Sequence, residues 1–164
     1  MGRKNIKCHG DDTRFEEVAQ FVYERFGNSI NHIADVAGGQ GLLSRILNKK
    51  YNYESEVVDP REHQIVGIKN QKCEYDHKMA DYYDLIIGLH PDQATSEIVE
   101  SAKVRSILLI PCCNFWDKTR KLGTVELVNA ICEYLEKENI DYEKITFNFK
   151  GPKNIGILVN HQKK

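Results

Sequence analysis

The sequence predicts an α/β fold with a doubly wound, mostly parallel sheet and a C-terminal antiparallel hairpin. Short apolar runs alternate with amphipathic segments along most of the chain. This alternation indicates parallel strands, because each parallel neighbour needs a crossover connection. The last two apolar runs, at 145–149 and 155–159, are separated by only five residues, which is short enough for a hairpin.

The amphipathic segments define the expected helices. The first opens with a capping box, Thr13 followed by Glu16, and ends at Gly27 and Asn28. A short helix is expected after Pro60, because the fixed φ of proline suits a first helical turn. The remaining helices are expected at 42–49, 92–102 and 124–138.

The apolar runs define the expected strands. The runs at 83–89 and 105–110 are nearly continuous, as in strands buried on both faces. Further strands are expected at 30–36 and 56–58, and a weaker candidate spans 72–76. Together these segments predict five strand-to-helix steps followed by an antiparallel pair.

Length and composition limit the classes of function. The chain has 164 residues, no repeat and no linker, so a single domain over 1–164 is expected. Lys and Arg number 23 against 24 Asp and Glu, so the chain lacks the strongly basic composition of a free-standing nucleic-acid binder. A local basic patch remains compatible with this composition. Five irregularly spaced cysteines favour a reducing compartment, hence a cytoplasmic protein. No run reaches the roughly 20 apolar residues of a membrane span and no signal peptide is evident, so no membrane partner is expected.

A glycine-dense turn joins the first expected strand to the next helix. It contains Gly38, Gly39 and Gly41, with the small Ala37 just before them. Glycines let a ligand approach the main chain, and the helix that follows offers free N–H groups at its N-terminus. Asp35 ends the strand, where its carboxylate can accept a hydrogen bond from an amine or hydroxyl of a ligand. The turn therefore predicts a site for a nucleotide-like ligand.

Asp59 follows the second strand, eighteen residues after Gly41, where a parallel strand would offer a carboxylate to a ribose diol. The pattern Asp35-x-Ala37-x-Gly39-x-Gly41, with Asp59, resembles the first motif and the ribose-binding acid of class I S-adenosylmethionine-dependent methyltransferases. Dinucleotide oxidoreductases are the competitor. They usually carry a third glycine inside the helix, where this chain has Ser44.

The resemblance covers about residues 30–160 and implies the Rossmann-like methyltransferase fold with S-adenosylmethionine as cofactor. It also implies that Asp76, at the end of the 72–76 segment, lies near the adenine amine, with Asp81 as the alternative. The expected cofactor-binding residues are Asp35, Ala37, Gly38, Gly39, Gly41, Asp59, Asp76 and Gly88.

Polar and reactive residues follow two central strands. His90 and Asp92 come after the 83–89 strand, and Cys112 and Cys113 come after the 105–110 strand. This pair of segments resembles a methyltransferase subgroup that includes tRNA ribose methyltransferases, although that subgroup often has His where this chain has Asn114. In doubly wound sheets ligands bind beyond the carboxyl ends of strands, so we take these four residues as catalytic candidates. His90 can act near neutral pH, whereas Asp92 also suits a helix N-cap.

Cys112 and Cys113 have three interpretations: small buried residues, metal ligands, or a nucleophile as in pyrimidine C5 methylation. Adjacent cysteines without a second regularly spaced Cys/His pair do not make a zinc site, although Cys8 and His9 are a conceivable partner, so no metal is assigned. The sequence shows no base that would activate either thiol, so covalent catalysis is not expected.

Phe115 and Trp116 follow the two cysteines, where aromatic rings either stack on a base or pack as a lid. The expected function is that of an S-adenosylmethionine-dependent methyltransferase in RNA modification, with tRNA as the substrate class that the resemblance favours. A small-molecule or protein methyltransferase, and a non-catalytic cofactor-binding subunit that needs a protein partner, remain as alternatives.

Overall fold

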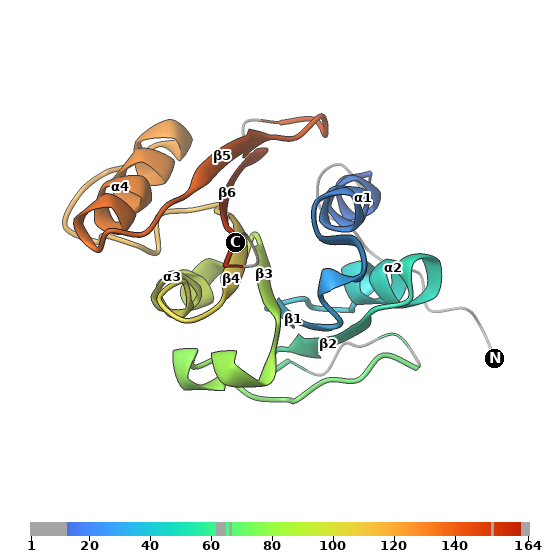
Figure 1. Cartoon of the computed structure of the whole chain (residues 1–164). Coiled ribbons are helices and arrows are strands. Elements are labelled where there is room, and N and C mark those ends of the chain that lie inside the picture. Colours follow the sequence, from blue (N-terminus) through green and yellow to red (C-terminus); the bar gives the residue numbers. More distant parts are fainter. Residues whose placement is uncertain (1–12, 62–64, 66, 152, 162–164) are drawn as a thin grey trace.

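A computed structural model describes residues 13–61, 65, 67–151 and 153–161. Within them the chain forms one six-stranded sheet in the order β2-β1-β3-β4-β6-β5 (Figure 1). The first four strands in chain order run parallel, and β6 pairs antiparallel with both β4 and β5. The strands are β1 (His32–Val36), β2 (Glu54–Val58), β3 (Leu85–Leu89), β4 (Ser106–Ile110), β5 (Glu143–Thr146) and β6 (Ile155–Val159). The mostly parallel sheet with its closing hairpin is therefore confirmed.

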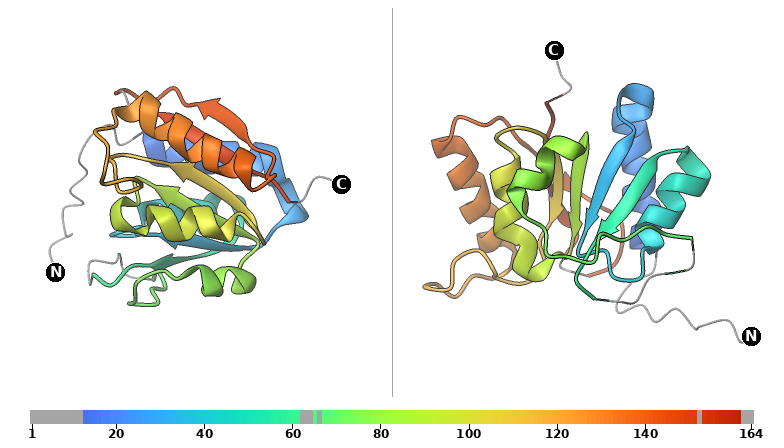
Figure 2. Two further views of the ribbon diagram at one scale, coloured as in Figure 1. Left: turned by 90° about the vertical axis from the view of Figure 1, so that its left-hand side faces the viewer. Right: turned by 90° about the horizontal axis from the view of Figure 1, so that it is seen from below.

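Helices cover both faces of this sheet, as the view from below shows (Figure 2). One face carries α1 (Arg14–Phe26) and α2 (Leu42–Tyr51). The other carries α3 (Thr95–Ser101) and α4 (Thr124–Lys137). Three short 3-10 helices complete the described elements: η1 (Gly27–Ser29), η2 (His77–Tyr82) and η3 (Asp92–Ala94).

Alternate residues of the strands point into two separate cores. In β3, Leu85 and Ile87 pack against α1 and α2, whereas Ile86 packs on the side of α3 and α4. Successive side chains of a strand point to opposite faces, so a strand covered on both sides must be apolar throughout. All five residues of β4 are buried, which explains why the 105–110 segment reads as a continuous apolar run.

The strand expected at 72–76 does not form, so the sheet has four parallel strands in place of five. The residues just before the segment make a single bridge to β2, between Asn70 and Val57, with 2.9 Å from Val57 N to Lys69 O. Lys72 has φ +47°, a left-handed conformation that no strand accommodates. The polar composition of the segment also reduces the gain from burying it, so β2 remains the edge strand of the sheet.

Three smaller expectations also differ from the structure. Thr13 has helical backbone angles in place of the extended ones of an N-cap, and its side chain makes no capping hydrogen bond. The helix expected at 92–102 begins as η3 and ends at Ser101, and β5 spans Glu143–Thr146 in place of 145–149. The short helix expected after Pro60 falls largely on residues 62–64 and 66, which lie outside the described residues. Among the described helices, none is long and apolar enough to cross a membrane.

Candidate functional site

The carboxyl ends of β1, β2 and β3 meet at one edge of the sheet and border a cleft of about 680 Å³. This volume lies within the range of small-molecule and cofactor sites. Polar groups from several elements converge on it, among apolar walls from strand ends and the loop after β4. The lining residues are Val36, Ala37, Val58, Asp59, Pro60, Arg61, Glu74, Tyr75, Asp76, Pro91, Asp92, Gln93, Ala94, Glu97 and Phe115.

The glycine turn after β1 is a tight loop closed by a hydrogen bond from Gly41 N to Gly38 O of 3.0 Å. Gly41 has φ +87°, and a Cβ there would lie 2.7 Å from the side chain of Ile68. A Cβ on Gly38 would lie 2.6 Å from the carboxylate of Asp35. Glycine is therefore required at both positions, because the turn packs so closely against Asp35 and Ile68 that no space remains for a Cβ.

Asp35 lies beneath this turn, where it is 2% exposed, and does not line the cleft. Its Oδ2 accepts hydrogen bonds from Ser44 Oγ at 2.8 Å and from Ser44 N at 3.3 Å. Ser44 lies in the first turn of α2, so the carboxylate ties the end of β1 to the start of this helix. Burial raises the pKa of Asp35 to about 6, although the hydrogen bonds from Ser44 act against that rise.

Asp59 lines the cleft at the end of β2 and is 1% exposed. Its Oδ2 accepts a hydrogen bond from Gly39 N at 3.0 Å, which links the end of β2 to the glycine turn. Arg61 donates to both carboxylate oxygens, with 2.7 Å from Nη2 to Oδ2 and 3.0 Å from Nε to Oδ1. Burial alone would raise the pKa of Asp59, but the hydrogen bonds from Arg61 and Gly39 outweigh it and hold the pKa below its usual value.

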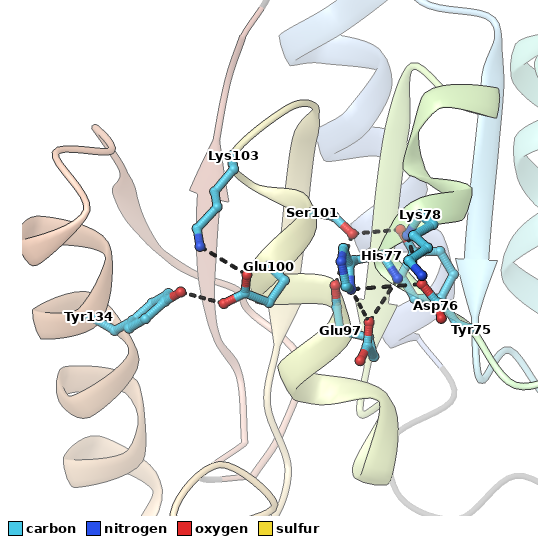
Figure 3. A network of polar contacts seen from close by, with 9 residues as sticks. All are labelled: Tyr75, Asp76, His77, Lys78, Glu97, Glu100, Ser101, Lys103 and Tyr134. Atoms are coloured by element: carbon cyan, nitrogen blue, oxygen red, sulfur yellow. Dashed lines mark hydrogen bonds and ion pairs between the residues drawn. The ribbon is translucent and has the colours of Figure 1, made fainter.

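Asp76 also lines the cleft and belongs to a polar network that links η2 to α3 (Figure 3). Its Oδ1 accepts a hydrogen bond from Lys78 N at 2.8 Å, which caps η2. Next to it, His77 Nδ1 lies 2.6 Å from Glu97 Oε2. The buried hydroxyl of Tyr75 lies 2.6 Å from Ser101 Oγ. Asp76 is thus held at the cleft by the segment that replaces the expected strand.

His90 follows β3 directly but points away from the cleft, toward the β5–β6 connection. Its Nε2 lies 2.9 Å from the backbone oxygen of Lys153, and its ring packs edge-on against Phe149. A carbonyl oxygen only accepts hydrogen bonds, so Nε2 carries the hydrogen. Burial lowers the pKa of His90.

Cys112 and Cys113 lie at the same edge, just after β4, with 3.4 Å between their sulfur atoms. Lys153 Nζ lies 3.4 Å from Cys112 Sγ and 3.5 Å from Cys113 Sγ. A carboxylate oxygen of Asp92 lies within 4.8 Å of both sulfurs, and Asp92 also lines the cleft. Cys8 and His9, considered as partners of this pair, lie outside the described residues.

The backbone is strained where the chain leaves the sheet at this edge. Ala37, His90 and Asp92 have φ values of +54°, +53° and +51°, respectively. Residues other than glycine rarely adopt this region, and such strain gathers at functional sites. Gly88, the last expected cofactor residue, does not line the cleft, and a Cβ on it would lie 2.4 Å from the side chain of Ile98.

The residues after the cysteine pair have divided roles. Phe115 lines the cleft. Trp116 packs edge-on against Tyr134 at 5.2 Å between ring centroids and lies half-buried against the core on the side of α4. Asn114 holds the following loop, because its Nδ2 donates to the backbone oxygens of Asp117 at 2.7 Å and Arg120 at 2.8 Å.

The structure thus brings Ala37, Asp59, Asp76 and Asp92 together around one cleft, with the glycine turn bordering it. Sequence reasoning missed Arg61 and Lys153. Arg61 follows Asp59 by two residues at a strand end, so its position was a usable signal. Lys153 had no such signal, because 40 residues separate it from Cys113 and only the fold brings them together.

Solved methyltransferase structures share this architecture. The sugar N-methyltransferase KedS8 from Streptoalloteichus sp. aligns over 99% of this chain and 99% of its own, with a TM-score of 0.59 and 12% identity. The plantazolicin methyltransferase BpumL in complex with SAH aligns over 92% of this chain and 86% of its own, with a TM-score of 0.58 and 14% identity. The ribosomal protein L11 methylase from Lactobacillus delbrueckii subsp. bulgaricus aligns over 92% and 81%, with a TM-score of 0.57 and 14% identity.

No protein-family model matches the chain, and no curated protein matches it in sequence. According to their names, these three methyltransferases act on a sugar, on plantazolicin and on a ribosomal protein, and none of the names mentions an RNA. At 12–14% sequence identity, the similarity between this chain and these structures concerns the fold alone. The chain has the mixed α/β, Rossmann-like fold of these methyltransferases.

Proposed function

We propose that this protein is an S-adenosylmethionine-dependent methyltransferase. The observation that carries the proposal is the cleft itself, which places the carboxylates of Asp59 and Asp76 on a pocket of about 680 Å³ beside the glycine turn and the strained Ala37. This donor set fits an adenosine-containing ligand, because carboxylates accept hydrogen bonds from ribose hydroxyls and from the adenine amine. The apolar walls formed by Val36, Val58 and Ala94 suit the base.

Each cofactor residue has a role in this proposal. Asp59 accepts the ribose hydroxyls, and Asp76 accepts the adenine amine. Asp35 acts through Ser44, because its carboxylate fixes the start of α2 and thereby the shape of the glycine turn. Bound S-adenosylmethionine would supply a methyl group on a positively charged sulfur, and the cleft that holds the cofactor would orient the acceptor atom toward it. Positioning of the acceptor at the cleft then supplies much of the rate.

We propose RNA, with tRNA as the first candidate, as the methylated substrate. Lys118, Arg120 and Lys121 are exposed on the loop that Asn114 holds, and they line a shallow hollow of about 550 Å³. This hollow offers the local positive charge that a phosphate backbone requires, although the whole chain has a net charge of −1. Phe115 on the cleft wall offers a ring for stacking on a base.

Isothermal titration with S-adenosylhomocysteine and, separately, with NAD tests the cofactor. The proposal expects S-adenosylhomocysteine to bind and NAD not to bind. NAD binding without S-adenosylhomocysteine binding would indicate an oxidoreductase. Transfer of a labelled methyl group to total tRNA then tests the substrate. Cofactor binding with transfer to no RNA, unless a second protein is added, would instead indicate a cofactor-binding subunit.

The basic loop gives a second test of the substrate. The double variant Lys118→Ala/Lys121→Ala should weaken tRNA binding and flatten its dependence on salt, because fewer phosphate contacts release fewer counterions. Lys49→Ala/Lys50→Ala, at the end of α2, is the matched control for removal of two charges. Equal loss in both double variants would contradict a role for this loop.

A further inference from the structure

We propose that Cys112, Cys113 and Asp92 form a binding site for a thiophilic divalent cation, with Zn²⁺ as its natural occupant. The fold brings these residues together from the segments that follow two neighbouring strands, β3 and β4, and Asp92 also lines the cleft. Their ligand atoms, two sulfurs and a carboxylate oxygen, all lie within 4.8 Å of one another. The proposal does not depend on methyl transfer, because it rests on these atoms alone.

The spacing of the two sulfurs suits one metal ion. Thiolates bound to Zn²⁺ at about 2.3 Å in tetrahedral geometry stand about 3.8 Å apart. The sulfurs of Cys112 and Cys113 are already 3.4 Å apart, so they need only a small rotation. Asp92 offers a carboxylate on an exposed side chain, which is free to close the remaining distance. Two thiolates and a carboxylate leave the fourth position of a tetrahedral site for a water molecule.

A cation already lies against the sulfurs. The ammonium of Lys153 approaches both of them, at 3.4 and 3.5 Å. We infer that this ammonium occupies the place of the metal in the metal-free state and must leave when the metal binds. Lys153 lies in the connection between β5 and β6, so its side chain moves without disturbing a strand. As the metal binds, each thiol gives its proton to solvent and two sulfur–metal bonds form.

Sequence spacing could not identify this site. A zinc site is recognised in a sequence by two pairs of Cys or His ligands at regular intervals. Cys112 and Cys113 have no such second pair among the described residues. Asp92 lies 20 residues before Cys112 and becomes a neighbour only because β3 and β4 pair in parallel. Asp92 begins η3, shortly after the end of β3 at Leu89, and has a left-handed φ of +51°.

Titration of the reduced, metal-free full chain with Co²⁺ and then Zn²⁺ tests the site. Thiolate-to-cobalt charge-transfer absorption should appear at one Co²⁺ per chain and disappear as Zn²⁺ replaces it. Cys112→Ser and Cys113→Ser should each weaken Zn²⁺ binding by at least about tenfold, and Asp92→Asn should also weaken it. Cys73→Ser, a half-buried cysteine outside the cluster, is the matched control and should leave binding unchanged.

Lys153→Met should have the opposite effect from the cysteine variants. It removes the competing ammonium and keeps the length of the side chain, so Zn²⁺ should bind more tightly. A gain in affinity for Zn²⁺ cannot result from misfolding of the variant. Absence of charge-transfer absorption in the natural chain would overturn the proposal. So would Zn²⁺ binding that is unchanged in the double variant Cys112→Ser/Cys113→Ser.

Discussion

Arg61 covers both carboxylate oxygens of Asp59, with 2.7 Å between Nη2 and Oδ2. The same carboxylate holds Gly39 N of the glycine turn. Asp59 therefore joins the turn after β1 to the loop after β2, on the wall of the cleft. A ligand whose hydroxyls donate hydrogen bonds to Asp59 would share this carboxylate with Arg61. Arg61 therefore holds the carboxylate in position as an acceptor before the ligand binds.

The first prediction concerns the proposed ribose contact. Asp59→Ala should weaken S-adenosylhomocysteine binding by about 1–3 kcal/mol, because ligand hydroxyls lose their acceptor. Isothermal titration measures the affinity, and thermal melting checks that the variant is folded. Asp141→Ala removes an exposed carboxylate and is the control. Unchanged affinity in a folded Asp59→Ala protein would contradict the assigned contact.

The second prediction concerns the packing of the glycine turn. Gly38→Ala should lower the free energy of unfolding by about 1–3 kcal/mol, because the new Cβ would lie 2.6 Å from the buried carboxylate of Asp35. Gly123→Ala is the control, because its added Cβ meets only the flexible end of Glu126. Urea unfolding compares the two variants. Equal stabilities would show that the turn yields without strain.

The third prediction concerns the buried charge of Asp35. Its pKa in the folded chain, about 6, lies above the ordinary value of 3.8, so the folded state holds the proton more tightly. Its contribution to stability is therefore largest below about pH 4 and decreases as the pH rises through 6, by on the order of 3 kcal/mol in total. Asp35→Asn cannot ionise and should lack this decrease. Urea midpoints between pH 4 and 7 measure it, and parallel profiles of the two proteins would refute the raised pKa.

The fourth prediction concerns His90, whose pKa lies below its ordinary value because the ring is buried. The unfolded chain then takes up a proton at a higher pH than the folded chain, so stability decreases as the pH falls below about 6.5. His90→Gln keeps a donor for the Lys153 oxygen without a titrating ring and should remove this decrease. NMR titration of the ring measures the midpoint directly. A midpoint above 6.5 would contradict the burial argument.

Local pattern was enough to predict most elements of the fold. Leu85 to Leu89 and Ile107 to Ile110 carry no polar side chain because helices cover both faces of the sheet, and that requirement is visible in sequence. The strand predicted at 72–76 is absent for a local reason too. The left-handed backbone of Lys72 and the polar neighbours of Tyr75 convert a candidate strand into a loop that delivers Asp76 to the cleft.

The sequence by itself determined the alternation of strands and helices, the glycine turn and the acidic residues near the ends of β1 and β2. Each of these depends on backbone geometry or on burial within a few residues. Only the tertiary structure decided that Asp35 lies under the turn while Asp59 lines the cleft, and that His90 and Lys153 meet at the hairpin. Such contacts join segments far apart in the chain, and their partners are chosen by the pairing and packing of the whole sheet, which no local spacing records.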